Sequence, residues 1–172
     1  GARPDDDIWV SGTLGDAALG LAIRRDNYVA PDAHRNLAID RLELPTPRNN
    51  LGLALRGLAT AAIDVSDGLL ADLGHLCERS DLGANIRLAD VPVSDALRGV
   101  EDESMRLRFM LSGGDDYELC FTAPHAAQAN IRRLQGVLGL PLTCIGTMRS
   151  GQGVTVLDEV GLPVSLTVGG FD

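Results

Sequence analysis

The stretch of sequence that decides the fold is Ala-Ala-Ile-Asp-Val-Ser-Asp-Gly-Leu-Leu, at residues 61–70. It begins as an apolar run and breaks at a cluster of short polar residues. It then continues into a helical pattern, in which apolar residues of 69–77 recur on one face. Either Ser66 or Asp67 is expected to cap this helix, because a side-chain oxygen there accepts a free backbone N–H. The stretch therefore predicts a strand, an acidic turn and a helix.

The acidic turn has the composition of a metal and phosphate site. Asp64, Ser66 and Asp67 place two carboxylates and a hydroxyl at the end of the predicted strand. Mg²⁺ is usually bound by one or two carboxylates together with substrate phosphates, and a helix N-terminus attracts a phosphate. The structural alternative is that Asp67 only caps the helix and Asp64 is a solvated turn residue. On spacing alone this alternative is favoured, because capping acids are common.

Two well-known motifs are excluded at this turn. It has no Gly-Lys-Ser or Gly-Lys-Thr, so it is not a P-loop. The twelfth position counted from Asp64 is His75, where an EF-hand requires Glu.

The composition indicates a globular protein that does not bind polyanions. The chain has 172 residues, a hydrophobic fraction of 45% and a net charge of −9. So acidic a surface repels nucleic acid and anionic membranes. Aromatic residues make up only 3%, too few for base-stacking platforms. We expect neither a nucleic-acid nor a membrane partner.

The cysteines point to a reducing compartment. Cys77, Cys120 and Cys144 are scattered in apolar patterns, and the three histidines show no zinc-binding spacing. No apolar run reaches membrane-spanning length and no signal-peptide pattern opens the chain. These features predict a cytoplasmic protein.

The order of elements predicts an α+β fold, a mixed β-sheet packed against helices, in a single domain spanning 1–172. Strands are predicted at 8–11, 61–65, 84–88, 117–121, 142–148, 153–157 and 163–168, the last two as a hairpin. Helices are predicted at 16–23, 32–44, 49–59, 69–77, 101–111 and 125–138, with a short helical turn at 95–97. Residues 1–7 read as a cut through a linker, so we expect the chain to be a piece of a longer protein.

Three loop segments leave alternatives open. Gly12 to Asp16 is either a phosphate-binding turn or a tight turn with Asp16 as helix cap, and the cap is favoured. Arg48 follows a proline-rich stop and either binds an anion or is simply solvated, and the solvated residue is favoured. The Gly-Gly pair at 113–114, before Asp115 and Asp116, either lets the backbone approach a ligand or is an ordinary turn into a strand.

Taken together, five segments resemble the C-terminal half of thiamine-monophosphate kinase. Two are specific to that family, and the other three are weaker. The segments are Ile-Asp-Val-Ser-Asp-Gly-Leu at 63–69, Ser-Gly-Gly-Asp-Asp-Tyr-Glu-Leu at 112–119, Pro-Thr-Pro-Arg at 45–48, Gly-Thr-Leu-Gly-Asp at 12–16 and Gly-Phe-Asp at 170–172. The resemblance covers essentially the whole chain and implies a fold like the C-terminal domain of aminoimidazole-ribonucleotide synthetase. It reverses the preference for a purely structural acidic turn.

The resemblance implies phosphoryl transfer from ATP to thiamine monophosphate, giving thiamine diphosphate and ADP, with several Mg²⁺ ions between the substrates. Asp64 and Asp67 match Mg²⁺ ligands, and Ser66 matches an ATP contact. Asp115 matches a substrate-binding acid, and Phe171 matches an aromatic residue that packs on the thiamine moiety. No catalytic acid or base is assigned, because this chemistry depends on positioning and charge neutralisation.

Two departures from the family pattern limit the comparison. The family usually carries Glu where this chain has Asp115. The family's N-terminal domain, which forms a homodimer and supplies most Mg²⁺ ligands, is absent from the sequence, so the fragment alone is expected to be inactive. A related ATP-dependent synthetase of the same superfamily and a non-catalytic nucleotide-binding or packing domain remain as alternatives.

Overall fold

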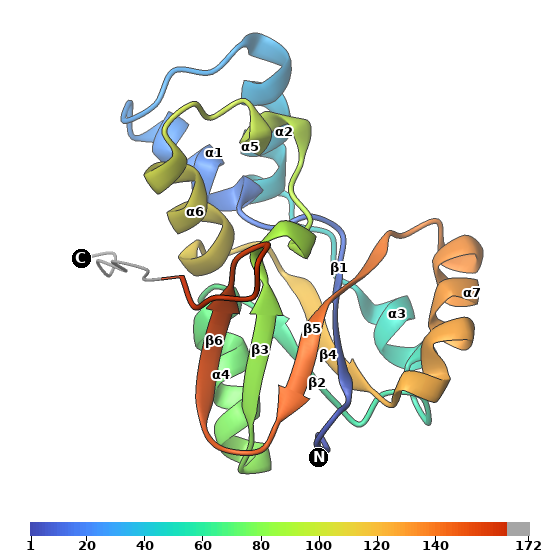
Figure 1. Cartoon of the computed structure of the whole chain (residues 1–172). Helices are drawn as coiled ribbons and strands as arrows, with labels where there is room; N and C mark the ends of the chain where they lie inside the picture. Colours follow the sequence, from blue (N-terminus) through green and yellow to red (C-terminus); the bar gives the residue numbers. More distant parts are fainter. Residues whose placement is uncertain (165–172) are drawn as a thin grey trace.

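The chain forms a six-stranded sheet with helices on both faces and a group of helices at one end (Figure 1). The structure, a computed structural model, describes residues 1–164. The strands are β1 (Asp7–Ser11), β2 (Ala61–Val65), β3 (Gly83–Arg87), β4 (Glu118–Ala123), β5 (Leu142–Arg149) and β6 (Gly153–Leu157). The α-helices are α1 (Asp16–Arg24), α2 (Asp32–Glu43), α3 (Asn49–Ala54), α4 (Leu69–Ser80), α5 (Asp95–Arg98), α6 (Glu103–Ser112) and α7 (Gln128–Leu138). Two 3₁₀ turns, η1 (Leu88–Asp90) and η2 (His125–Ala127), complete the described elements.

The sheet is mixed, as the sequence predicts. Its strand order is β2-β4-β1-β5-β3-β6. Every neighbouring pair is antiparallel except β3 and β6, which run parallel. The α+β prediction is therefore confirmed.

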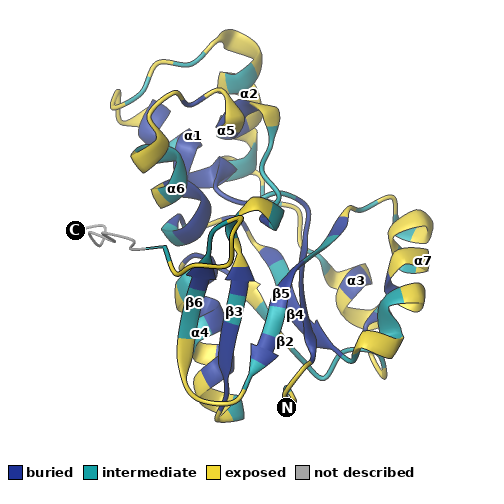
Figure 2. Cartoon of the chain, viewed as in Figure 1, coloured by how far each residue is buried: buried dark blue, intermediate teal, exposed yellow. Residues whose placement is uncertain are grey.

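Alternation along β1 separates two hydrophobic cores. Ile8 and Val10 point into a core shared with α4 and α6, whereas Trp9 belongs to a second core with α3 and α7. In the second core the rings of Trp9 and Phe121 stack with centroids 6.4 Å apart. The whole of β1 is buried (Figure 2), because helices cover both faces of the sheet at this strand.

The group of helices α1, α2, α5 and α6 lies beyond one end of the sheet (Figure 1). At that end β2 finishes with Val65, opposite the first residue of β4, Glu118. The acidic turn after β2 and the loop before β4 therefore meet beneath these helices.

Helices α1 and α2 pack unusually closely. A Cβ built on Gly20 of α1 would lie 2.3 Å from the carbonyl oxygen of Ala38, the one buried residue of α2. Because the contact is made by small residues and backbone, α2 needs no broad apolar stripe. This explains why its sequence is only weakly amphipathic.

Two predicted elements differ from the structure. The helix predicted for 49–59 ends at Ala54, because the chain tightens into a turn and Gly57 adopts a φ of +80°. The predicted hairpin is only partly described: Pro163 bridges Leu157, and the Val164 N–H donates to Val156 O at 2.8 Å. The rest of the segment 163–168 lies outside the described residues.

Within residues 1–164, the helices are too short or too polar to cross a lipid bilayer.

Two glycines in helices test the close packing of α1 on α2. We expect Gly20→Ala to lower the free energy of unfolding by about 1–3 kcal/mol, because its Cβ would overlap Ala38 O. The matched control is Gly136→Ala in α7, where a Cβ meets no atom within 4 Å. That change should stabilise by up to about 1 kcal/mol through helix propensity. Urea unfolding monitored by circular dichroism measures both, and equal effects would contradict the packing argument.

Candidate functional site

The candidate site lies where the acidic turn meets the loop before β4. The Asp115 N–H donates to Ser66 O, and the Tyr117 N–H donates to Val65 O, both at 2.9 Å. A Cβ on Gly114 would lie 2.4 Å from Ser66 O, so this approach requires glycine. The two loops are therefore joined through their backbones, which leaves the side chains of the acidic turn free.

The loop before β4 holds two residues in the left-handed region. Asp115 has a φ of +66° and Tyr117 a φ of +51°. Such conformations cost about 1–3 kcal/mol each for residues with a Cβ, and they cluster where a side chain must be aimed. Here both side chains are exposed, whereas the intervening Asp116 is buried.

Three predicted site residues line one pocket. Ser66, Asp67 and Asp115 border a cavity of about 380 Å³ whose opposite wall is α1. Arg25, which directly follows α1, adds an exposed cation that sequence analysis missed. With Ser112 also lining it, the pocket combines two carboxylates, two hydroxyls and a guanidinium.

Asp64 borders a different pocket. It lies on the opposite side of β2 from Val65, because side chains alternate along a strand. There it lines a largely apolar cavity of about 710 Å³ with Pro45, Pro47 and Tyr117. The structure therefore brings Ser66, Asp67 and Asp115 together and places Asp64 beside them, on the other side of the turn.

The three predicted acids of the site are available to a ligand. Among residues 1–164, the carboxylates of Asp64, Asp67 and Asp115 have no hydrogen-bond or ion-pair partner, and all three are exposed. In the same range no cluster of three or more His, Cys, Asp or Glu forms a metal site. The donor set nevertheless fits Mg²⁺, which needs only one or two protein carboxylates when phosphates and water complete its shell. Phe171, the remaining predicted site residue, lies outside the described residues.

The predicted capping of α4 is wrong. Gly68 precedes the helix with a φ of +103°, and neither Ser66 nor Asp67 caps it. Instead the buried Asp72, within the first turn of α4, accepts the N–H groups of Ser66 and Asp67 at 2.8 and 2.9 Å. A helix carboxylate therefore fixes the turn, and the turn's own side chains stay free for a ligand. An acid in the first helical turn was the available sequence signal.

The predicted cap of α1 is also wrong. Asp16 is buried and accepts the hydroxyls of Thr13 and Ser94 at 2.6 and 2.5 Å. The start of α1 is held by Asp116, which accepts the N–H groups of Gly15 at 2.6 Å and Ala17 at 3.3 Å. Burial raises the pKa of Asp116 to about 7, against the lowering effect of these hydrogen bonds.

Arg48 is not the solvated residue that sequence analysis favoured. Its Nε and Nη2 donate to the two carboxylate oxygens of Glu118 at 2.7 and 2.5 Å. Arg41 donates to the same carboxylate at 2.9 Å. Glu118 is fully buried. Burial raises its pKa, but hydrogen bonds from Arg48 and Ser11 and the two arginine charges outweigh this and hold the pKa below its usual value.

Sequence analysis missed Glu118 because it lies within a β-prone run. The available signal was a charged residue between apolar ones near the start of the strand predicted at 117–121, because a carboxylate that is buried in a strand needs a partner.

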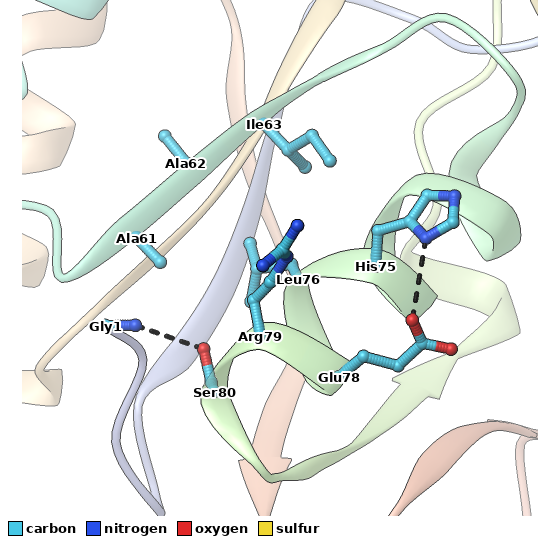
Figure 3. A pocket seen from close by; sticks show the side chains of 9 residues that line it. All are labelled: Gly1, Ala61, Ala62, Ile63, His75, Leu76, Glu78, Arg79 and Ser80. Carbon is cyan, nitrogen blue, oxygen red and sulfur yellow. Dashed lines mark hydrogen bonds and ion pairs between the residues drawn. The ribbon is translucent and has the colours of Figure 1, made fainter.

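A further pocket lies at the free edge of β2, against α4 (Figure 3). It has a volume of about 580 Å³ and is lined by Ala61 and Ala62 on the strand and by His75 and Arg79 on the helix. His75 pairs with Glu78 at 3.7 Å on the exposed surface of α4. None of the predicted site residues borders this pocket, so it is separate from the acidic turn.

Comparison with known proteins assigns the chain to a family. The family model described as AIR synthase related protein, C-terminal domain, matches residues 3–159. The thiamine-monophosphate kinase of Escherichia coli (strain K12) is 47% identical over 174 residues, which cover 100% of this chain and 53% of that protein. The chain thus spans about half the length of the curated relatives it matches.

Solved structures agree with this assignment. The crystal structure of thiamine-monophosphate kinase from Stenotrophomonas maltophilia K279a superposes with a TM-score of 0.85 at 47% identity, covering 90% of this chain and 51% of that one. AaThiL complexed with AMPPCP and TMP superposes with a TM-score of 0.79 at 32% identity, covering 96% of this chain and 50% of that one.

Removing the buried charge of Glu118 tests the ion pairs that it forms with Arg41 and Arg48 beside the site. We expect Glu118→Gln to lower the free energy of unfolding by about 3 kcal/mol or more, because Arg41 and Arg48 lose their counter-ion. Glu43→Gln is the control, since it breaks an exposed pair with Arg24 and should cost less than about 1 kcal/mol. Urea unfolding measures both. Similar losses of unfolding free energy in the two variants would show that the buried ion pairs of Glu118 stabilise the fold no more than an exposed pair does.

The raised pKa of Asp116 predicts a particular pH dependence. Between the unfolded value of 3.8 and about 7 the folded state holds a proton that the unfolded state has released. The contribution of Asp116 to the free energy of unfolding is therefore greatest below pH 3.8. It decreases as the pH rises towards 7, by at most about 1.4 kcal/mol per pH unit. We expect Asp116→Asn, which cannot titrate, to lack this component. Urea unfolding of both proteins across this range measures the difference, and parallel pH curves would contradict the assignment.

Proposed function

The chain belongs to the AIR synthase related protein family, as its C-terminal domain, and from that premise we propose that it is part of an ATP- and Mg²⁺-dependent thiamine-monophosphate kinase. The reaction transfers a phosphoryl group from ATP to thiamine monophosphate and releases thiamine diphosphate and ADP. The observation that carries the proposal is the meeting of Ser66, Asp67 and Asp115 around one pocket, with their side chains uncommitted. The 47% identity to a thiamine-monophosphate kinase over the whole chain supports the same conclusion.

Each site residue has a role in this proposal. Asp64 and Asp67 hold Mg²⁺, which supplies positive charge against the phosphates of the two substrates. Ser66 contacts ATP, and Asp115 contacts thiamine monophosphate with a side chain one methylene shorter than the usual Glu. Phe171 packs on the thiamine moiety.

The protein scaffold contributes mainly by holding these groups in place. Phosphoryl transfer depends on positioning and on charge stabilisation, so a rigid turn is more useful than an added general base. Asp72 fixes the turn through the N–H groups of Ser66 and Asp67. The backbone bond between Asp115 and Ser66 sets the spacing of the ATP and substrate contacts.

The proposal includes partners and a location. We expect an N-terminal domain of the same protein to supply further Mg²⁺ ligands and to form a homodimer, as the resemblance to thiamine-monophosphate kinases implies; the chain covers 53% of the matched Escherichia coli protein. We also place the enzyme in the cytoplasm, which is supported by three free cysteines, two of them buried.

Formation of thiamine diphosphate tests the function. In the longest natural chain that contains this segment, supplied with ATP, Mg²⁺ and thiamine monophosphate, we expect product. Asp64→Asn should lower its rate by about a hundredfold or more, because a metal ligand is worth several kcal/mol in the transition state. Glu101→Gln, an exposed acid outside the site, should leave the rate unchanged. The 172-residue chain alone should form no product.

The outcomes separate the alternatives. A folded parent that forms no product would contradict the kinase and favour a related synthetase or a non-catalytic nucleotide-binding domain. Equal rates in the parent and Asp64→Asn would retain the kinase and return Asp64 to a structural role.

A further inference from the structure

A polar pocket on the α7 side of the sheet shares no residue with the site at the acidic turn. It has a volume of about 590 Å³ and lies between α7, the end of β3 with η1, and the neighbouring strands β1 and β5. Volumes of this size suit small molecules rather than macromolecular partners. The proposed kinase makes no use of this pocket.

One face of α7 supplies the polar wall of the pocket. Gln128, Arg132 and Gln135 are spaced by four and three residues, so they lie on the same face of the helix. Both glutamines are committed to the protein: Gln128 Nε2 donates to Asp7 at 2.8 Å, and Gln135 Oε1 accepts the Leu142 N–H at 3.4 Å. Arg132 has no hydrogen-bond or ion-pair partner among residues 1–164. It is therefore the uncommitted cation of the pocket.

Most charges at the pocket are paired within the protein. Arg87 and Asp90 both border it and pair with each other. The nearby carboxylate of Asp7 is bound by Gln128 and His125. Among the described residues, Arg132 is therefore the one lining charge left for a ligand, and a guanidinium attracts an anion.

Trp9 forms part of the floor of the pocket and is only 2% exposed. Its Nε1 is buried away from solvent, so a ligand in the pocket does not reach this N–H group. Thr143 adds a hydroxyl at the same rim.

We propose that this pocket binds a small molecule through an oxyanion, the phosphate or carboxylate group of a metabolite, with Arg132 as its principal ligand. The Thr143 hydroxyl at the rim serves as an additional donor. The site is distinct from the acidic turn, and it does not depend on the kinase reaction proposed above.

Trp9 makes the proposal directly measurable because it is the single tryptophan of the chain. Inorganic phosphate and, separately, acetate are titrated at constant ionic strength while the tryptophan emission is recorded. We expect a saturable change with at least one of the two anions. Response to phosphate alone identifies a phosphate site, and response to acetate alone identifies a carboxylate site.

Two substitutions in α7 identify the cation. We expect Arg132→Gln to weaken the response about tenfold or more, because it removes a charge-assisted hydrogen bond. Arg133→Gln is the matched control: Arg133 is also exposed on the same helix but does not border the pocket. It should bind like the parent, and circular dichroism verifies that both variants are folded. Absence of a saturable change in the parent, with no heat of binding that Arg132→Gln abolishes, overturns the proposal. Equal binding by the parent and Arg132→Gln does the same.

Discussion

The buried carboxylate of Glu118 is the point at which four segments of the chain are joined. It accepts the Ser11 hydroxyl at the end of β1, the guanidinium of Arg41 in α2 and that of Arg48 before α3. A Cβ at Gly12 would lie 2.2 Å from Glu118 Oε1, so the chain must pass this carboxylate without a side chain. Since an unpaired buried charge is very costly, the helices at the end of the sheet are held in one arrangement relative to β4.

Buried and exposed side chains alternate along the loop that leads to Glu118. Asp116 and Glu118 point inward, where they hold the start of α1 and the two arginines. Asp115 and Tyr117 point outward, and both require left-handed backbone. The backbone strain and the buried carboxylates therefore have a common consequence: they aim Asp115 at the pocket beside Ser66.

The acidic turn likewise has one carboxylate that holds the backbone and others that remain without a partner. Asp72 holds the backbone from within α4, and Asp64 and Asp67 remain without partners among the described residues. A carboxylate that caps a helix or pairs with arginine has little remaining capacity for a cation. Because Asp72, Asp116 and Glu118 hold the structure, the fold leaves exposed carboxylates available to a cation, which the proposed phosphoryl-transfer chemistry requires.

Sequence by itself determined the fold class, most of the elements and the turn for which we propose a role in the chemistry. Hydrophobic periodicity is a local property, so the helix after residue 68 and the mixed α+β architecture followed from it, and the motifs at 63–69 and 112–119 identified the acidic residues. Only the tertiary structure decided which acids are free. The caps expected from Ser66, Asp67 and Asp16 were wrong. Asp72, later in its helix, binds the N–H groups of Ser66 and Asp67. Asp116, distant in sequence, binds those of Gly15 and Ala17. Arg48 was taken as solvated because its partner lies 70 residues away in the chain. Such pairings depend on burial and on contacts between remote segments, which spacing along a chain does not encode.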